Sequence, residues 1–486
     1  MALKTPEQFL ESIRDDREIY LDGKKVEDVT TDRVLKDLAE YAAADYEMAL
    51  DPRYQKLFTE PLPNGERVHF TFVSPRTKED LIRRRALIQM TTRAQGAPGG
   101  AKFTGIDGLN GVTLACKRID RKIGTEYSDR VAKFRQHCID TDAAVAVAMT
   151  DVKGNRSLHP HQQQGHQDYY LRIVSKGNDG IVINGAKAHI SHAPVVNEII
   201  VLPCRAMGKN DSDYAVACAV PANAKGLKMI GNAGDGQHPL LVFDNVFVPT
   251  DRVFLAGEWE YAHQMPYCFA TYHRLSADTY KYVELEGFIG CAGLLAEYNG
   301  LEKVPHIREK LAWLVMWVEG TDALGKAAVE NCEYDESGTA YPNTVYSNVA
   351  KHFYASNYHE AEKHLTDIAG GLLSTLPSLA ELDNPATSSY VRKYLGINDK
   401  LTADDRMRVF MLAQHLCGYF NGNITIHAEG SLAAQKMMLY AYADWDRYKA
   451  IARRFAGIET DHELVSKLPK KRGSHHNDVR SRRFKS

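Results

Sequence analysis

Long apolar segments are missing from this chain of 486 residues. No apolar run reaches the roughly 18 residues that a membrane-spanning helix needs, and the first residues show no apolar stretch typical of a secretory signal peptide. An excess of charge of one sign is missing as well, because the formal net charge is only -2. No overall electrostatic field therefore favours nucleic acid or an anionic membrane. We expect a cytoplasmic protein that binds neither nucleic acid nor a membrane.

Paired cysteines and a dinucleotide-binding loop are also missing. The eight cysteines show no CxxC or CxxxC spacing, so free thiols in a reducing compartment are expected rather than disulfides. His159, His161 and His166 lie close together in sequence. Most metal sites built from histidines also contain carboxylates or cysteines, but the neighbours at 162–164 are glutamines. No Gly-x-Gly-x-x-Gly follows an expected strand. The sequence thus predicts neither a metal site nor a nicotinamide-binding domain.

The pattern of the chain changes along its length, and a chain of this size needs more than one core. Residues 1–142 are expected to form a mainly helical domain, with a hairpin at 18–26 whose turn is Asp-Gly. Residues 143–256 contain short β-branched and aromatic runs at the spacing of a barrel or sandwich. Residues 257–456 carry the long amphipathic segments of a helical bundle. A basic tail, expected to be solvated, occupies residues 457–486.

Individual elements follow from the hydrophobic period. Apolar residues at helical spacing predict helices at 7–16, 32–50, 276–299, 304–332, 342–372, 404–420 and 428–456. Short runs between turns predict strands at 169–174, 180–185, 197–202, 214–220 and 240–249. The small residues at 94–105 predict a loop, which is either a flexible connection or a place where a ligand approaches the backbone.

Two short segments of the strand-rich part carry the clearest functional signal. Met149 and Thr150 stand in a turn after an apolar run, where backbone N–H groups and a hydroxyl suit a planar, electron-accepting ring. Ser191 stands at an expected strand end, from which its hydroxyl could reach the same ring. Lys187 and His189 alternate on that expected strand, so they line either a cofactor or a solvated sheet face. This pattern is typical of a flavin site without a Gly-rich phosphate loop.

Several motifs occur in an order that is typical of one family. They lie at 18–30, 148–156, 179–189, 241–249, 272–274 and 367–371. Together they resemble the family of 4-hydroxyphenylacetate 3-hydroxylases and 4-hydroxybutyryl-CoA dehydratases, and most of them are closer to the dehydratase branch. The resemblance implies an acyl-CoA dehydrogenase-like α+β fold with an N-terminal helical domain, a middle β-barrel domain and a C-terminal helical bundle. It also implies FAD as the cofactor.

The chain departs from the dehydratase branch at the residues that hold an iron–sulfur cluster. In that branch three cysteines and one histidine bind a [4Fe-4S] cluster. This chain keeps the histidine as His273 but has Gly99, Phe103 and Tyr280 at the cysteine positions. Because such a cluster needs thiolates, we predict that none is bound.

The resemblance also indicates that the substrate pocket has changed. Two carboxylates and a tyrosine of the dehydratase branch are replaced, whereas a lysine is kept; the matching residues are His238, Ile424, Ala277 and Lys281. The substrate-binding arginine, tyrosine and histidine of the hydroxylase branch fall near Thr104, Gly108 and Val147. Neither branch's full set of catalytic groups is present.

His273 is the predicted catalytic base. A histidine titrates near neutral pH and can move protons, and with no cluster to bind its imidazole is available. Lys281, about two helical turns further along, is predicted to hold a substrate carbonyl or carboxylate, and His238 is predicted to add a third polar group. The alternative for His273 is a core histidine bonded to the backbone.

Gly370 and Gly371 are assigned by the resemblance to the cofactor of a neighbouring subunit. In the related fold, a Gly-Gly pair at this place lets the backbone approach FAD across a subunit interface. The alternative is an ordinary helix C-cap. The cofactor contact requires an oligomer, so a homotetramer is expected.

Three functions stay open. The first is a reduced-FAD-dependent monooxygenase for a small aromatic or acyl substrate, supplied by a separate reductase because the chain has no nicotinamide-binding motif. The second is a cluster-free acyl-CoA dehydratase or isomerase in which His273 moves a proton and Lys281 holds the thioester. The third is an inactive flavin-binding scaffold that has lost both sets of catalytic groups.

Overall fold

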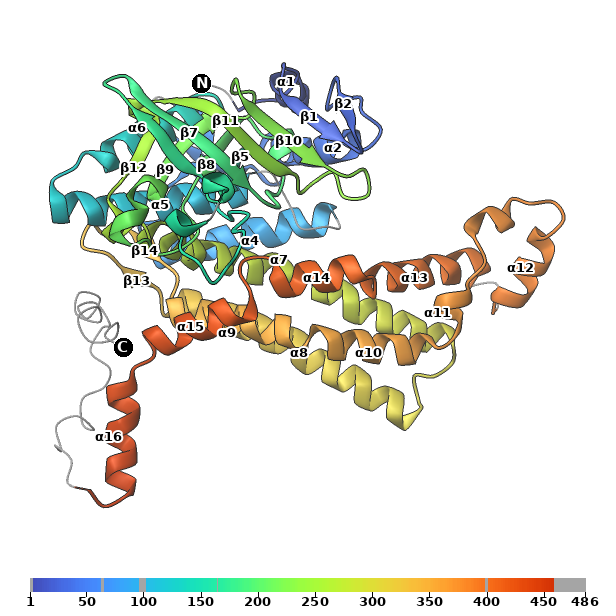
Figure 1. Cartoon of the computed structure of the whole chain (residues 1–486). Helices are drawn as coiled ribbons and strands as arrows, with labels where there is room; N and C mark the ends of the chain where they lie inside the picture. Colours follow the sequence, from blue (N-terminus) through green and yellow to red (C-terminus); the bar gives the residue numbers. More distant parts are fainter. Residues whose placement is uncertain (1–2, 63–64, 96–101, 164, 398–400, 459–486) are drawn as a thin grey trace. The chain divides into compact units, whose positions relative to one another are not determined.

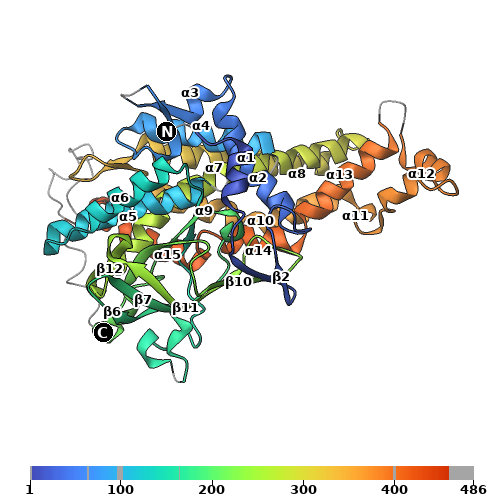
Figure 2. The same cartoon turned by 90° about the horizontal axis from the view of Figure 1, so that it is seen from above.

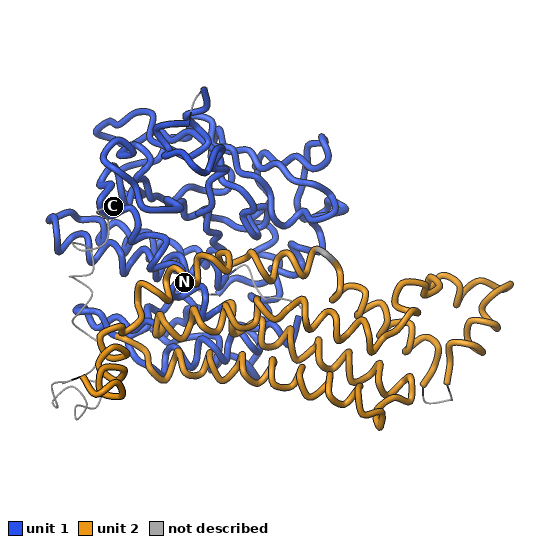
Figure 3. The backbone as a smooth tube through the Cα atoms, turned by 60° about the horizontal axis from the view of Figure 1, so that its bottom comes forward, with its two compact units in different colours: residues 1–276, 334–341 blue, residues 277–333, 342–486 orange. Residues whose placement is uncertain are grey.

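The computed structural model describes residues 3–62, 65–95, 102–163, 165–397 and 401–458. The chain divides into two compact units, with residues 1–276 and 334–341 in unit 1 and residues 277–333 and 342–486 in unit 2 (Figure 3). Among the described helices, none is both long and apolar enough to cross a membrane. The predicted tail lies outside the described residues from 459 onwards. The predicted domain boundaries at 142/143 and 256/257 stay predictions.

Local chemistry sets the ends of the helices in unit 1. Thr5 caps the first helix in a reciprocal box with Gln8, and Gly124, at φ +71°, ends the fifth helix in the left-handed conformation. The helices are α1 (Pro6–Ser12), α2 (Lys36–Leu50), α3 (Gln55–Phe58), α4 (Lys78–Gln95), α5 (Phe103–Ile123) and α6 (Tyr127–Asp140) (Figure 1). Helix α7 (Gln264–Tyr298) begins in unit 1 and continues into unit 2.

Two sheets share the core of unit 1 (Figures 1 and 2). The six-stranded sheet has the order β2 (Lys24–Val26), β1 (Glu18–Leu21), β10 (Leu227–Gly231), β11 (Leu240–Pro249), β7 (Gly180–Lys187) and β6 (Arg172–Lys176). The four-stranded sheet has the order β12 (Val253–Ala256), β9 (Val216–Pro221), β8 (Glu198–Val201) and β5 (Val145–Ala148). Two small sheets consist of β3 (Thr59–Pro61) with β4 (Arg67–His69), and β13 (Glu333–Tyr334) with β14 (Ala340–Tyr341).

The alternating pattern of the strands explains the shared core. In β7, Ile181 and Ile183 are buried while Val182 between them is half-buried, and apolar residues of both sheets join one continuous cluster. The predicted hairpin at 18–26 is confirmed, with Asp22 (φ +49°) and Gly23 (φ +77°) at its turn. Its strand β1 also pairs in parallel with β10. The N-terminal hairpin therefore completes a sheet of the strand-rich part.

Unit 2 is helical. Its helices are α8 (Pro305–Glu330), α9 (Thr344–Ser356), α10 (Tyr358–Ala369), α11 (Leu372–Thr375), α12 (Ser388–Leu395), α13 (Ala403–Leu416), α14 (Tyr419–His427), α15 (Leu432–Tyr442) and α16 (Trp445–Phe455), together with the second half of α7. Trp317 stands in the core, edge-on to Phe288 at 5.6 Å between ring centroids, and its indole N–H donates to Tyr354 O. Helices α8, α10 and α13 run side by side (Figures 1 and 2).

Several predicted helices differ from the observed ones in their bounds. The helix predicted at 276–299 begins at Gln264, so His273 lies well inside it. The predicted helix at 342–372 is broken at Asn357 into α9 and α10. The one predicted at 428–456 is broken where the Asp444 side chain accepts from Arg447 N–H and caps α16. A short polar side chain that competes for backbone hydrogen bonds explains this last break.

Candidate functional site

The two predicted flavin-binding segments lie next to each other in unit 1. Met149 and Thr150 directly follow β5, and Thr150 O accepts a hydrogen bond of 2.8 Å from Ala188 N–H, just beyond the end of β7. Asp151 and Lys187 form a β-bridge at the same place. The ends of the two sheets thus meet where both segments leave their strands.

Lys187 stabilises this junction from the protein interior. Its ammonium is almost fully buried, lies 2.7 Å from an Asp151 carboxylate oxygen, and donates to Met149 O at 3.0 Å and Leu202 O at 2.8 Å. A buried ammonium with three acceptors fixes the backbone around it. The structure therefore gives Lys187 a positioning role, while direct contact with a cofactor stays a prediction.

His189 does not share a strand face with Lys187, which corrects the expected alternation. Strand β7 ends at Lys187, and His189 has a left-handed backbone with φ +49°. The pKa of its imidazole is lowered, first by partial loss of hydration and then by the neighbouring basic side chains of Lys153, His238 and Arg156. These basic side chains gather beside the junction, where an anionic group such as a pyrophosphate would be favoured.

Several hydrogen-bond donors at the junction are unused. Within the described residues, the N–H groups of Met149 and Thr150 and the hydroxyls of Thr150 and Ser191 donate to no protein acceptor. All three residues are half-buried, and Ser191 stands in a turn four residues beyond the end of β7. Unused donors on a rigid sheet edge beside basic side chains fit the polar edge and phosphates of FAD.

His273, on α7, is held by a carboxylate that the sequence analysis missed. Its Nδ1 lies 3.1 Å from an oxygen of Asp107, which is fully buried in α5, and its ring stacks on Phe269 at 4.8 Å. Asp107 also accepts from Arg84 at 2.6 Å and from the Ser276 hydroxyl at 2.9 Å. The side chain of His273 is 13% exposed. It is therefore an oriented imidazole rather than a histidine bonded to the backbone.

A signal for Asp107 was present in the sequence. It stands between Ile106 and Gly108 in a helix stretch otherwise made of small and apolar residues. A carboxylate at a buried helical position needs a partner. That partner, Arg84, comes from α4, so the pair could not be identified from spacing alone.

Lys281 belongs to a separate buried polar cluster in unit 2. Its ammonium donates to Glu284 at 2.6 Å and to the Thr425 hydroxyl at 3.3 Å. Lys351, also buried, donates to Thr425 O at 2.7 Å, and its ammonium lies 3.4 Å from the carboxylate of Glu429. His273 and Lys281 share helix α7 but fall in different units. A joint catalytic role of the two stays a prediction.

The other predicted site residues have clear positions. His238 precedes β11, and its Nδ1 lies 2.7 Å from an Asp235 oxygen. Gly370 ends α10 at φ +69°, as a C-cap does, and both Gly370 and Gly371 are exposed with open space where a Cβ would be. That open space would admit a neighbouring backbone. Contact of this pair with a cofactor also stays a prediction.

Two of the residues near the hydroxylase-branch positions, Gly108 and Val147, pack closely against each other. A Cβ on Gly108 would lie 2.4 Å from Val147 Cγ2, so α5 packs directly against β5 at these two positions. A tyrosine at 108 could not fit without moving the strand. The changed pocket predicted from the sequence stays a prediction.

In the described part of the chain, no group of three or more histidine, cysteine or acidic side chains could hold a metal ion. His161 Nδ1 lies 2.6 Å and His159 Nδ1 lies 3.4 Å from the buried Asp211 carboxylate. Phe103 and Tyr280 supply no thiolate, and Gly99 lies outside the described residues. The donors present do not fit an iron–sulfur cluster.

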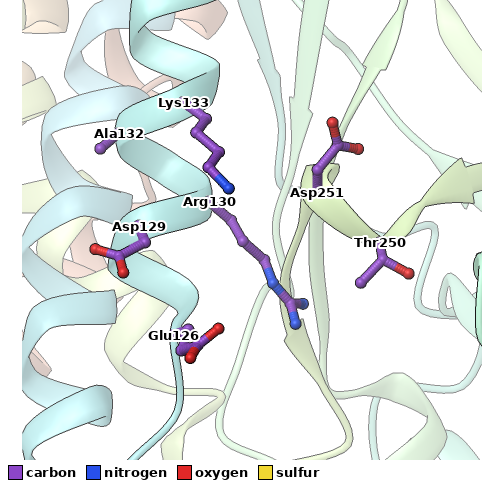
Figure 4. Close-up of a pocket in the computed structure, with 7 residues that line it drawn as sticks. All are labelled: Glu126, Asp129, Arg130, Ala132, Lys133, Thr250 and Asp251. Carbon is purple, nitrogen blue, oxygen red and sulfur yellow. The ribbon is translucent and has the colours of Figure 1, made fainter.

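A surface pocket of about 580 Å³ lies away from these predicted residues (Figure 4). It is lined by Glu126, Asp129, Arg130, Ala132, Lys133, Thr250 and Asp251. The lining carries both signs of charge and includes none of the predicted site residues. We assign it no function.

Comparison with known protein families gives two matches that together span almost the whole chain. The family model described as the 4-hydroxyphenylacetate 3-hydroxylase N terminal matches residues 5–255. The one described as the 4-hydroxyphenylacetate 3-hydroxylase C terminal matches residues 262–457.

Individual proteins of both branches are similar to this chain. The 4-hydroxybutyryl-CoA dehydratase/vinylacetyl-CoA-Delta-isomerase of Clostridium aminobutyricum is 32% identical over 492 residues, covering 94% of this chain and 100% of that protein. The structure of an oxygen-tolerant archaeal 4-hydroxybutyryl-CoA dehydratase from N. maritimus superposes with a TM-score of 0.88 at 28% identity, covering 96% and 97% of the two chains. The oxygenase component of a 4-hydroxyphenylacetate 3-monooxygenase, complexed with FAD and 4-hydroxyphenylacetate, gives 0.83 at 26% identity, covering 93% and 98%. The predicted acyl-CoA dehydrogenase-like α+β fold is confirmed.

Proposed function

Because the chain belongs to the 4-hydroxyphenylacetate 3-hydroxylase family of enzymes, we propose that it is an FAD-dependent oxidoreductase. The finer proposal is a monooxygenase that receives reduced flavin from a separate reductase and acts on a small aromatic or acyl substrate. The observation that carries it is the set of unused donors at Met149, Thr150 and Ser191. When bound, reduced FAD supplies the electrons with which oxygen is activated.

The residues around the junction of the two sheets would hold the cofactor. The N–H groups and hydroxyls of Met149, Thr150 and Ser191 would bind the polar edge of the flavin ring, where negative charge builds up on reduction. Lys187 would keep these donors in place from beneath, because it anchors Met149 O. His189 and the basic side chains near it would favour the pyrophosphate. Gly370 and Gly371 of a neighbouring subunit would complete the site in a homotetramer.

His273 is the proposed proton acceptor. Because the Asp107 carboxylate accepts a hydrogen bond from Nδ1–H, the lone pair of the imidazole is on Nε2. Nε2 would therefore be the atom that accepts a proton from the substrate. Asp107 does not move a proton in this scheme. It fixes the tautomer and the ring orientation, and Arg84 and Ser276 hold its carboxylate in turn.

The substrate would differ from that of the hydroxylase branch. The close packing of Gly108 on Val147 leaves no side chain at these positions that could hydrogen-bond a phenol. A site built for a polar group loses affinity when its partner groups are missing. We therefore place the substrate among small aromatic or acyl compounds other than 4-hydroxyphenylacetate.

The test is oxygen consumption by the protein loaded with FAD. The flavin is reduced chemically under anaerobic conditions, mixed with oxygen, and offered a panel of phenols and acyl thioesters. The proposal expects consumption of oxygen and a product that contains one oxygen atom from O₂. A protein that takes up no FAD, or whose reduced form yields no oxygenated product from any compound, would contradict it.

A second candidate function is a cluster-free acyl-CoA dehydratase or isomerase. It is favoured by the histidine and the lysine that the resemblance to the dehydratase branch assigns, His273 and Lys281, both of which lie in α7. This function needs no oxygen and leaves the flavin oxidation state unchanged overall. Exchange of substrate α-protons with D₂O under anaerobic conditions would support it, and a flavoprotein inactive in both assays would be a scaffold.

A further inference from the structure

The segment that links β7 to the Ser191 turn has a strained backbone that its neighbours hold in place. Ala188 N–H donates to Thr150 O at 2.8 Å, and His192 N–H donates to Gln237 O at 3.0 Å. Between these anchors, His189 and His192 have φ values of +49° and +62°. Residues with a Cβ rarely adopt this left-handed conformation. It persists only where the surroundings impose it, and it is frequent at ligand sites.

The His192 ring carries a buried donor without an acceptor. The residue is 7% exposed, and its Nε2 lies 3.1 Å from the amide nitrogen of Gln237. Nε2 therefore accepts, and the ring proton is on Nδ1. Within the residues that the structure describes, Nδ1 has no hydrogen-bond partner. Burial lowers the pKa of His192 to about 4, and the nearby His238 adds to the effect, so the ring is neutral at pH 7.

Strain and an unpaired donor at the same residue both act against the folded state. Buried donors without acceptors are rare in native proteins. Both would be compensated if a ligand supplied an acceptor at Nδ1. The adjacent Ser191 is one of the residues with an unused donor, so the ligand expected at this place is the flavin.

We infer that His192 contacts the cofactor, with its Nδ1–H donating a hydrogen bond to an oxygen or nitrogen acceptor of the bound flavin. The inference rests on the proposed function, because it needs FAD beside Ser191. It adds a residue that the family motifs do not identify. It also explains why a non-glycine residue occupies a left-handed position there.

The experiment compares FAD binding by the full-length protein and by His192→Gly. Glycine carries no penalty at φ +62°, so the change removes the ring and its Nδ1–H donor without adding strain. Loss of one hydrogen bond to the flavin should raise the Kd for FAD about tenfold and shift the flavin absorption maxima. His69→Asn is the matched control, because His69 is also buried, bonds Thr71 through Nδ1 and has an unpaired Nε2. It should leave both readouts unchanged.

The outcomes separate this inference from the proposed function. No FAD binding by the unaltered protein would overturn both. Normal FAD binding by the unaltered protein, with the same Kd and spectrum in His192→Gly, would overturn only the contact. If the glycine variant does not fold, His192→Ala takes its place, because alanine also lacks a side-chain donor. The same tenfold weakening is expected, and an unchanged Kd refutes the contact.

Discussion

Replacing His273 with alanine should separate catalysis from folding. The change removes the proposed proton acceptor, which lowers turnover by roughly 10²-fold or more, equivalent to about 2.7 kcal/mol of activation free energy. Asp107 keeps its bonds from Arg84 and Ser276 on one oxygen and loses only the donor to the other. Together with the lost stacking on Phe269, this should lower the free energy of unfolding by about 1–3 kcal/mol.

The assay is turnover of the FAD-loaded enzyme, with flavin content and thermal unfolding measured on the same sample. His137→Ala is the matched control, because His137 also bonds a carboxylate that binds an arginine, namely Glu198 with Arg252. It should keep full turnover. If His273→Ala retains turnover, the proton is moved by another group. If it unfolds while the control does not, His273 is a structural residue.

Four further outcomes are expected. Purified protein should bind FAD noncovalently and contain no iron, so stoichiometric iron and acid-labile sulfide would contradict the assignment. The native state should be a homotetramer whose FAD sites include Gly370 and Gly371 of a neighbour; a monodisperse monomer that retains FAD in analytical ultracentrifugation would exclude this. Lys187→Met should lower the free energy of unfolding by about 3–5 kcal/mol, because it leaves the buried Asp151 carboxylate unpaired, and denaturant titration at pH 7 measures the loss. Burial lowers the pKa of His69 to about 3, so the unfolded chain takes up a proton below pH 6.5 that the folded chain does not. Acid should therefore destabilise the protein, and His69→Asn should lose about 2 kcal/mol less stability between pH 7.5 and 5; parallel denaturation curves for the two proteins would refute the reasoning.

Local patterns in the sequence predicted where helices and strands lie better than they predicted which strands pair with each other. The Asp22-Gly23 turn fixed the first hairpin because both residues tolerate positive φ. The pairing of β1 with β10 could not be predicted, since a strand's own alternation does not identify its neighbour in a sheet. The early start of α7 was not predicted because polar and apolar residues are mixed in 264–275, so the apolar residues there show no clear helical spacing.

For the candidate site as well, some features could be predicted from the sequence and others could not. Met149, Thr150 and Ser191 could be assigned to one site because each follows an expected strand and together they match the pattern of a flavin site. The role of Lys187 beneath them could not be predicted, because its three acceptors are supplied by the fold. Asp107 was missed for the same reason. A carboxylate becomes an orienting group only when helices from separate parts of the chain exclude water around it.

The parallel pairing of β1 with β10 has a consequence for synthesis of the chain. The hairpin of β1 and β2 leaves the ribosome early, but its partner strand at 227–231 is made only after most of unit 1. During that interval one edge of the hairpin is open, and β10 would be an open edge in a chain truncated beyond β1 and β2. Open edges recruit strands from other molecules. Truncation that removes residues 18–26 should therefore cause aggregation during expression, although it removes no site residue.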